Sequence, residues 1–269
     1  MQGPRLKAGG RAFAHIAQYH PELTALRRDL HAHPELGFEE IYTSKRVKEA
    51  LKLCGVDEIH DGIGRTGVVG VIRGRSTASG SMVGLRADMD ALPIAELNTF
   101  DHASKHQGRM HACGHDGHTA MLLAAARQLA EHGNFSGALN LIFQPAEEGQ
   151  GGAVKMIADG LFDKIGGKPD YGFALHVGPG TAGQVYYKPG VLTSNSDSLE
   201  LTFNGRGGHG SMPSSTIDPV MMAARFTVDV QSVISREKDP SAFGVVTVGS
   251  IQAGSAGNII PDKARVRGT

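Results

Sequence analysis

The stretch HACGHDGHTA at residues 111–120 concentrates side chains that can bind a metal ion: His111, Cys113, His115, Asp116 and His118. Imidazole, thiolate and carboxylate ligands together suit zinc, manganese and similar ions, whereas calcium takes oxygen ligands alone. Cys113 and His115 are two residues apart, so in an extended loop both side chains point the same way. The stretch is therefore either a metal loop that leads into a helix or a polar loop that happens to be rich in histidine.

Three other segments supply acidic or imidazole side chains, each at the end of a short apolar run that predicts a strand. These are Asp88 and Asp90 after residues 82–87, Glu147 and Glu148 after residues 138–143, and His176 at the end of residues 171–177. Ligands of an open α/β sheet bind beyond the carboxyl ends of its strands, so we expect all four segments at one edge. Adjacent glutamates tend to point in different directions, so one of Glu147 and Glu148 can bind metal while the other moves protons.

Taken singly, these residues have ordinary structural explanations. A Glu-Glu pair is usually a solvated surface, two aspartates can cap a turn, and a histidine at a strand end is often a hydrogen-bonded structural residue. His31 and His33 lie two apart on a predicted helix and face different directions, so we interpret them as structural. The pattern leaves His111 and His118 undecided. Only the joint placement of the four segments favours a metal site.

The elements that must position these residues alternate along the chain. Apolar spacing and stop residues predict helices at 22–33, 39–54, 119–131 and 152–159, and strands at 67–73, 82–87, 138–143 and 171–177. The strand runs are almost continuously apolar, which is typical of strands buried on both faces. We therefore predict an α/β domain with a largely parallel sheet and helices on both faces. GIGRTG at 62–67 has the spacing of a dinucleotide-binding motif, but it precedes a strand and opens no helix, so we interpret it as a turn.

The pattern changes near residue 194. SLELTFNGRG alternates apolar and polar residues, a helix follows with Asp218 as its N-cap and Pro219 at its first position, and strands are predicted at 243–251 and 263–268. This predicts a separate α+β unit. We place the boundary at about residue 193, in the polar stretch TSNSDS, which gives a domain of residues 1–193 and a second of residues 194–269.

Composition narrows the function classes. The 269-residue chain has 27 Lys and Arg and 27 Asp and Glu, so its zero net charge gives no argument for nucleic acid or an anionic membrane as a partner. Its two cysteines do not make a disulfide framework, and we interpret Cys54 as a small buried residue. No apolar run is long enough for a signal peptide or a membrane span. The expectation is a soluble, cytoplasmic protein.

Seven motifs, in this order and spacing, together resemble a known family: LRRDLHAHPELGFEE, GLRADMDALPI, MHACGHDGHTAMLLAAA, IFQPAEEG, LHVGP, GRGGHGSMP and AGNIIPD. The family is that of the metal-dependent amidohydrolases, which includes hippurate hydrolase, N-acyl-amino-acid amidohydrolases and plant auxin-conjugate hydrolases, relatives of aminoacylase and glutamate carboxypeptidase. The resemblance covers nearly the whole chain from about residue 22. It implies a catalytic α/β domain with a two-metal site and an inserted α+β lid domain that also mediates dimerisation.

The resemblance also implies roles for individual residues. It makes metal ligands of four residues: Cys113, His115, Glu148 and His176. Glu147 would be the general base and later the proton donor to the leaving amine, and Asp90 would orient a ligand histidine. In the lid, His209 would help to stabilise the oxyanion and Asn258 would contact the substrate.

The implied reaction is hydrolysis of small N-acyl amino acids, assisted by two divalent ions per subunit, in a homodimer formed through the lid. Manganese or zinc is expected first, and cobalt or nickel also suits these ligands. Three alternatives stay open: an inactive truncated homologue that only dimerises, a dipeptidase or carboxypeptidase, and a metal-storage module. Family chains continue beyond the position of Thr269, so a further histidine ligand and the rest of the lid are expected from that part.

Overall fold

The computed structural model describes residues 10–76, 78–193 and 195–269, which form two compact units divided between Gln184 and Val185. The first unit contains α1 (Gly10–Ala32), α2 (Ile41–Cys54), β1 (Glu58–Ile63), β2 (Gly67–Arg73), β3 (Met82–Asp88), α3 (His115–His132), β4 (Ala138–Gln144), α4 (Gly152–Ala158), α5 (Leu161–Lys164) and β5 (Tyr171–Ala174). The sequence places the boundary later, after residue 193. Residues 178–193 are exposed and form neither helix nor strand, but only their polar end resembles a linker in sequence.

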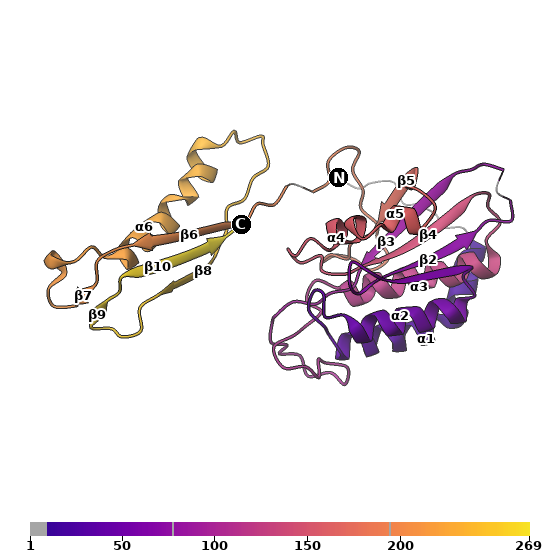
Figure 1. Cartoon of the computed structure of the whole chain (residues 1–269), viewed down its shortest axis with the longest axis horizontal. Helices are drawn as coiled ribbons and strands as arrows, with labels where there is room; N and C mark the ends of the chain where they lie inside the picture. Colours follow the sequence, from indigo (N-terminus) through magenta and orange to yellow (C-terminus); the bar gives the residue numbers. More distant parts are fainter. Residues whose placement is uncertain (1–9, 77, 194) are drawn as a thin grey trace. The chain divides into compact units, whose positions relative to one another are not determined.

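The sheet of the first unit has the strand order β1-β2-β4-β3-β5 (Figure 1). β3 pairs in parallel with β4 and with β5, whereas β2 pairs antiparallel with β1 and with β4. The α/β class is confirmed, and the sheet is mixed. The sequence did not predict β1, because EIHDGI lacks a clear apolar pattern. The turn at 62–67 joins it directly to β2, and so short a connection produces an antiparallel hairpin.

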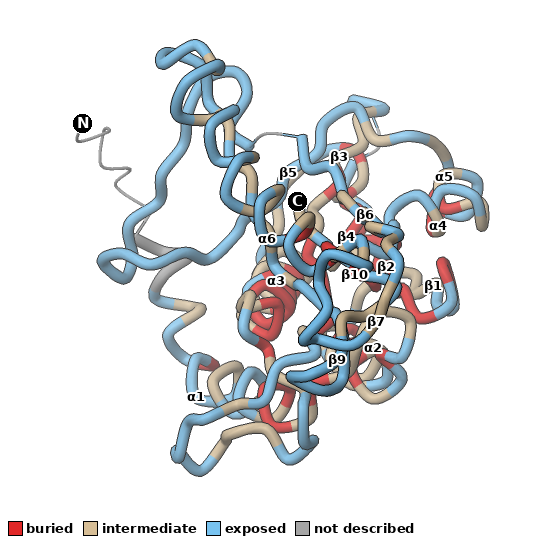
Figure 2. Tube along the Cα trace, turned by 90° about the vertical axis from the view of Figure 1, so that its left-hand side faces the viewer, coloured by how far each residue is buried: buried red, intermediate tan, exposed pale blue. Residues whose placement is uncertain are grey.

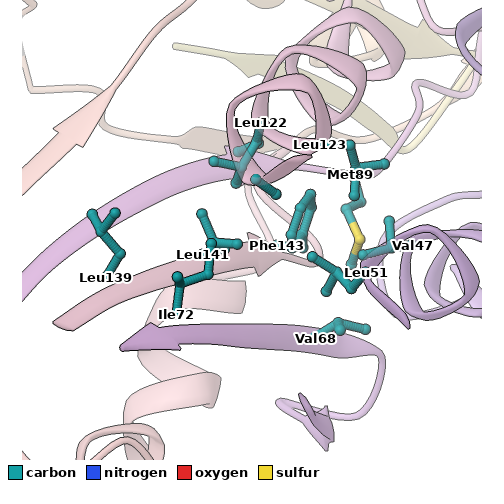
Figure 3. Close-up of a cluster of buried hydrophobic side chains, with 12 residues drawn as sticks. Val47, Leu51, Val68, Ile72, Met89, Leu122, Leu123, Leu139, Leu141 and Phe143 are labelled. Atoms are coloured by element: carbon teal, nitrogen blue, oxygen red, sulfur yellow. The ribbon is translucent and has the colours of Figure 1, made fainter. Parts of the chain in front are cut away.

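Helices cover both faces of this sheet, as predicted. On one face α2 and α3 pack on β2, β3 and β4, and α1 lies against α3 (Figure 1). Figure 3 shows the core between them, in which Leu51 and Leu123 from the helices meet Val68, Leu141 and Phe143 from the strands. On the other face a smaller core joins α4 and α5 to β1 and β2. The sheet thus lies between two helical layers that pack on its two faces.

The helix ends follow local chemistry. α2 stops at Gly55, whose left-handed conformation (φ 71°) is the usual way to end a helix. α1 is longer than the predicted helix 22–33 and includes Pro21. The apolar positions that predict this helix begin only at Leu23, so the sequence underestimates its length.

The second unit is an α+β structure made of β6 (Leu199–Asn204), β7 (Gly208–His209), η1 (Pro213–Ser215), α6 (Pro219–Asp229), η2 (Val233–Glu237), β8 (Val248–Ala253), β9 (Ile259–Ile260) and β10 (Lys263–Gly268). β6, β10 and β8 form an antiparallel sheet, and β7 pairs with β9. α6 packs on one face of the larger sheet through Ala223, Ala264 and Val266. As predicted, Asp218 caps α6 by accepting the backbone N–H of Val220.

None of the helices in the described ranges is both long and apolar enough to cross a membrane.

Candidate metal centre

The loop 111–114 and the first turn of α3 carry Cys113 and His115. Gly114, between them, adopts a left-handed conformation (φ 86°), and α3 already begins at His115. The prediction that Cys113 and His115 lie on one extended loop is therefore wrong. A Cβ at residue 114 would lie 2.3 Å from a methyl carbon of Val177, so only glycine allows this turn. The turn brings the loop against the end of β5.

The structure brings the four predicted segments together beyond the ends of β3, β4 and β5. Potential ligand atoms within 4.8 Å of one another form three groups, all of which contain His115: Cys113, His115 and His176; His115, Glu147 and Glu148; and Asp88, His115 and His118. The Cys113 Sγ lies 3.4 Å from the His176 Nε2. The expected convergence on one edge of the sheet is thus observed, with His115 at its centre.

Two histidines present the same ring nitrogen to this cluster. The Nδ1 of His115 lies 3.2 Å from Asp90 Oδ1, and the Nδ1 of His176 lies 2.6 Å from the carbonyl oxygen of Val177. Because both partners are acceptors, the Nδ1 atoms carry the protons and the Nε2 lone pairs are available to a metal. The buried Nε2 of His115 has no hydrogen-bond partner in the described part of the chain. Each ring can therefore offer its Nε2 lone pair to a divalent ion.

Glu148, the carboxylate candidate for a metal ligand, also has an atom free to bind an ion. The Glu148 Oε1 atom is buried and lacks a hydrogen-bond partner among the residues described, and it lies 3.8 Å from the His115 Nε2. Asp90 connects the two, since its other oxygen accepts the backbone N–H of Glu148 at 3.0 Å. The donor set therefore fits a metal ion, and Asp90 contacts both the histidine and the segment that carries the glutamates.

Electrostatics favour a cation in the cluster. Burial, together with the carboxylates of Glu148, Glu147 and Asp88, raises the pKa of the Cys113 thiol to about 12. Burial by itself lowers the pKa of His115, but the Asp90 hydrogen bond and the Asp88 and Glu148 charges outweigh it and raise the pKa. The site is thus dominated by negative charge. A divalent ion compensates such charge and stabilises the thiolate form of a cysteine.

His118, which the sequence left undecided, supports the cluster from one helical turn below His115. Its Nδ1 lies 2.5 Å from Asp88 Oδ1, and its Nε2 accepts the backbone N–H of Val177 at 2.9 Å. Burial raises the pKa of Asp88, but the His118 hydrogen bond and the charges of Arg86 and His115 bring it down to about 2. The spacing of three residues from His115 places His118 on the same helix face, and this helical periodicity is the sequence signal that links the two histidines.

Two other histidines lie outside the three groups. His111 is buried, and neither of its ring nitrogens has a hydrogen-bond partner within the described ranges. Burial lowers the pKa of His111 to about 4. His31 is buried between Asp116 and Glu96, with ring nitrogens 2.9 and 3.2 Å from their carboxylate oxygens. His31 thereby links α1 to the first turn of α3, next to His115.

The two predicted lid residues lie together in the second unit. β7, which contains His209, pairs with β9, which directly follows Asn258. The backbone N–H of Gly210 donates to the Asn258 carbonyl at 2.8 Å. The backbone N–H of Ser211 donates to the His209 Nδ1 at 3.1 Å, so the ring proton of neutral His209 is on Nε2. His209 is exposed, so this N–H is accessible to solvent.

An α/β sheet with cysteine, histidine and glutamate side chains beyond its strand ends is typical of the class of α/β proteins that bind metal at a sheet edge. The comparison with known families agrees with this class. Residues 84–257 match Peptidase family M20/M25/M40, and the chain belongs to that family.

Relatives of known name or structure support the assignment. The chain is 49% identical over 247 residues to the hippurate hydrolase of Campylobacter jejuni, covering 91% of this chain and 63% of the relative. A solved structure from methicillin-resistant Staphylococcus aureus is 36% identical, with a TM-score of 0.76 over 97% of this chain and 68% of that one. The Bacillus subtilis YXEP structure, described as a dinuclear metal binding peptidase, is 33% identical, with a TM-score of 0.61 over 94% and 64%. The chain therefore spans less than two thirds of the hippurate hydrolase.

Proposed function

We propose that the chain carries the metal centre of a hydrolase that cleaves the amide bond of small N-acyl amino acids. The observation that carries this proposal is the cluster around His115, where ligand atoms from Cys113, His176, Glu147 and Glu148 converge. The 49% identity to a hippurate hydrolase supports the substrate class.

In this proposal, divalent ions are held by four residues: Cys113, His115, Glu148 and His176. Mixed sulfur, nitrogen and oxygen ligands suit manganese or zinc first, and cobalt or nickel as well. The description of the YXEP structure as dinuclear supports two ions per chain. When bound, such ions polarise the substrate carbonyl and make water more acidic.

Glu147 is the proposed general base. It is exposed, unlike its partly buried neighbour Glu148, so water and substrate can reach its carboxylate. It takes a proton from the attacking water and later delivers that proton to the leaving amine of the amino acid. Asp90 orients His115 and the Glu148 backbone, so both sides of the cluster keep their geometry during these transfers.

The second unit is proposed to act as the lid, with residues from about 194 to 269, and to mediate homodimerisation. His209 donates its Nε2–H to the oxyanion that forms on the substrate carbonyl. Asn258, next to His209 across the β7–β9 pair, contacts the substrate. The Ser211 hydrogen bonds to Nδ1 support this role because they fix the proton of neutral His209 on Nε2.

The test is to replace Glu147 by Gln and to measure hydrolysis of hippurate together with metal content. We expect the rate to fall by roughly 10²–10⁴-fold while metal content stays at the wild-type value, because a general base is lost and the ligands remain. Glu148→Gln is the matched variant, since it should lose metal as well as activity. Unchanged hydrolysis in Glu147→Gln would remove Glu147 from the mechanism.

A peptidase is the second candidate, favoured by the name of the matching family. A panel of benzoyl, acetyl, indole-acetyl and aminobenzoyl amino acids, set against dipeptides, separates the two activities. A chain that binds metal but cleaves no compound of the panel would instead be an inactive member or a metal-storage protein.

A further inference from the structure

Glu40 is a fully buried carboxylate that lies far from the metal-binding segments in sequence. Its side chain is 0% exposed. One oxygen accepts the hydroxyl of Thr66 at 2.5 Å, and the other accepts the backbone N–H of Ala146 at 2.8 Å. Ala146 directly precedes Glu147 and Glu148. A buried carboxylate thus reaches across 106 residues to the segment that carries the proposed base and a proposed ligand.

The backbone around Glu40 is unusual. Among the described residues, three that are not glycine have a positive φ: Phe38 (64°), Arg65 (78°) and Ala146 (49°). Phe38 lies two residues before Glu40, Arg65 precedes Thr66, and Ala146 is itself the donor. Such left-handed conformations cost on the order of 1–3 kcal/mol each and persist only where their surroundings impose them. Of the three, Ala146 donates directly to Glu40, and Arg65 directly precedes Thr66, the other hydrogen-bond partner of Glu40.

Close packing strengthens the connection. A Cβ at Gly37 would lie 3.0 Å from the Cα of Ala146. The segment 37–40 therefore contacts the backbone of residues 145–149, called here the glutamate segment. The Arg65 guanidinium lies 4.9 Å from the centre of the Phe38 ring, which joins two of the left-handed residues to each other.

The glutamate segment is consequently fixed at two points. Glu40 holds the N–H of Ala146, and Asp90 holds the N–H of Glu148. Glu147 lies between these two hydrogen bonds. A change of φ at Ala146 would rotate the following peptide and turn Glu147 away from the His115 cluster.

We propose that Glu40 is a positioning residue, whose carboxylate holds Ala146 in the left-handed conformation and thereby aims Glu147 and Glu148 at the metal centre. The roles of Glu147 and Glu148 rest on the proposed function. The hold of Glu40 on the Ala146 backbone does not, so the two can be tested separately.

The experiment compares Glu40→Gln, Glu40→Asp and Glu40→Ala in the full chain. Gln keeps the length of the side chain, and its oxygen can still accept the Ala146 N–H while its NH₂ group donates to Thr66. Asp keeps the charge but is one methylene too short to reach Ala146. Glu35→Ala is the matched control, because Glu35 also accepts two backbone N–H groups, those of Tyr42 and Thr43, but does not touch the glutamate segment.

Three measurements are made on each variant: hydrogen exchange of the backbone amides in residues 145–149, affinity for Mn²⁺ or Zn²⁺, and kcat and KM for any substrate that the wild type cleaves. We expect Glu40→Asp and Glu40→Ala to accelerate exchange at Ala146 and to lower metal affinity or kcat by about 10–100-fold, with little change in KM. Glu40→Gln should stay within about threefold of the wild type, since the hydrogen bond is retained.

Two results would overturn the proposal. One is unchanged exchange and metal affinity in Glu40→Asp, which keeps the charge and is expected to fold even if Glu40→Ala does not. The other is an equal effect in Glu35→Ala, which would mean that Glu40 only stabilises the fold. If the wild type cleaves no N-acyl amino acid, the proposed function fails, but exchange and metal affinity still decide the role of Glu40.

Discussion

The candidate metal centre has a buried half and an exposed half, and the two are built differently. Asp88, Asp90, His115 and His118 are almost completely buried, and hydrogen bonds join the two imidazole rings to the two carboxylates. His176, by contrast, is exposed and follows β5, all of whose residues are exposed (Figure 2).

This contrast separates two properties of a metal site, its contribution to the stability of the fold and its affinity for metal. In the buried half, removal of one group leaves a partner charge without compensation inside the protein, so stability and metal binding fall together. In the exposed half, water replaces the lost contact, so only metal binding should fall. The predictions below test this separation, from the largest expected effect on stability to the smallest.

His115→Ala should have the largest effect. His115 belongs to all three ligand groups and lies against Asp88, Asp90 and Glu148. We expect metal binding to be lost and the free energy of unfolding to fall by about 3–5 kcal/mol, because the buried carboxylates lose the imidazole ring that they contact. Elemental analysis and urea unfolding in the presence of chelator measure the two effects. A variant with wild-type metal content would contradict the central place of His115.

Asp88→Asn should destabilise the metal-free chain in a pH-dependent way. The pKa of Asp88 is about 2, below its ordinary value of 3.8, so its ionised form stabilises the fold. This contribution is present above pH 3.8, where it amounts to about 2 kcal/mol, and is lost as the pH falls through 2. Urea unfolding of both proteins at pH 7 and at pH 2.5 should show the difference shrinking with acid. A constant difference would mean that the charge of Asp88 is not what stabilises the site.

His31→Asn tests the support that α1 gives to the buried half. The Asp116 hydrogen bond, opposed by burial and assisted by Glu96, raises the pKa of His31 above 6.5. The stabilisation by charged His31 is therefore complete below pH 6.5 and disappears as the pH rises through the folded-state pKa. We expect a loss of about 2 kcal/mol at pH 6 and a smaller loss at pH 9, measured by urea unfolding. A loss that grows with pH would show that His31 acts as a neutral residue.

His176→Ala should have the smallest effect on stability. Metal affinity should fall by roughly 10–100-fold, while the midpoint of urea unfolding in chelator should not move, because the exposed ring has little packing to lose. A competition assay with a metal indicator gives the affinity. If the midpoint fell as far as in His115→Ala, the distinction between the two halves would be wrong.

The same contrast explains what the sequence could reveal. The apolar runs at 67–73 and 138–143 predict strands because burial on both faces leaves a direct trace in composition. The end of the run at 138–143 locates Glu147 and Glu148, and the end of the run at 82–87 locates Asp90. Composition does not show that β2 runs antiparallel to β4, because a buried strand is apolar in either direction. It also does not show β1, whose residues lack a clear apolar pattern.

Other features depend on backbone geometry or on distant contacts. The left-handed turn at Gly114 cannot be distinguished from an extended loop by spacing alone. Glu40 is one of two adjacent glutamates, a pattern that predicts a solvated surface, and only the approach of Thr66 and Ala146 from distant segments makes its burial possible. His118 was recognisable in principle, because helical periodicity places it with His115.

The most direct test of the account is the metal content of the purified chain and of two cysteine variants, Cys113→Ala and Cys54→Ala. Both cysteines are free, but only Cys113 lies within reach of His115 and His176. We predict about two equivalents of divalent metal in the wild type and in Cys54→Ala, and a clear loss in Cys113→Ala. Equal metal content in all three proteins, or none in the wild type, would contradict the assignment of this cluster as the metal centre.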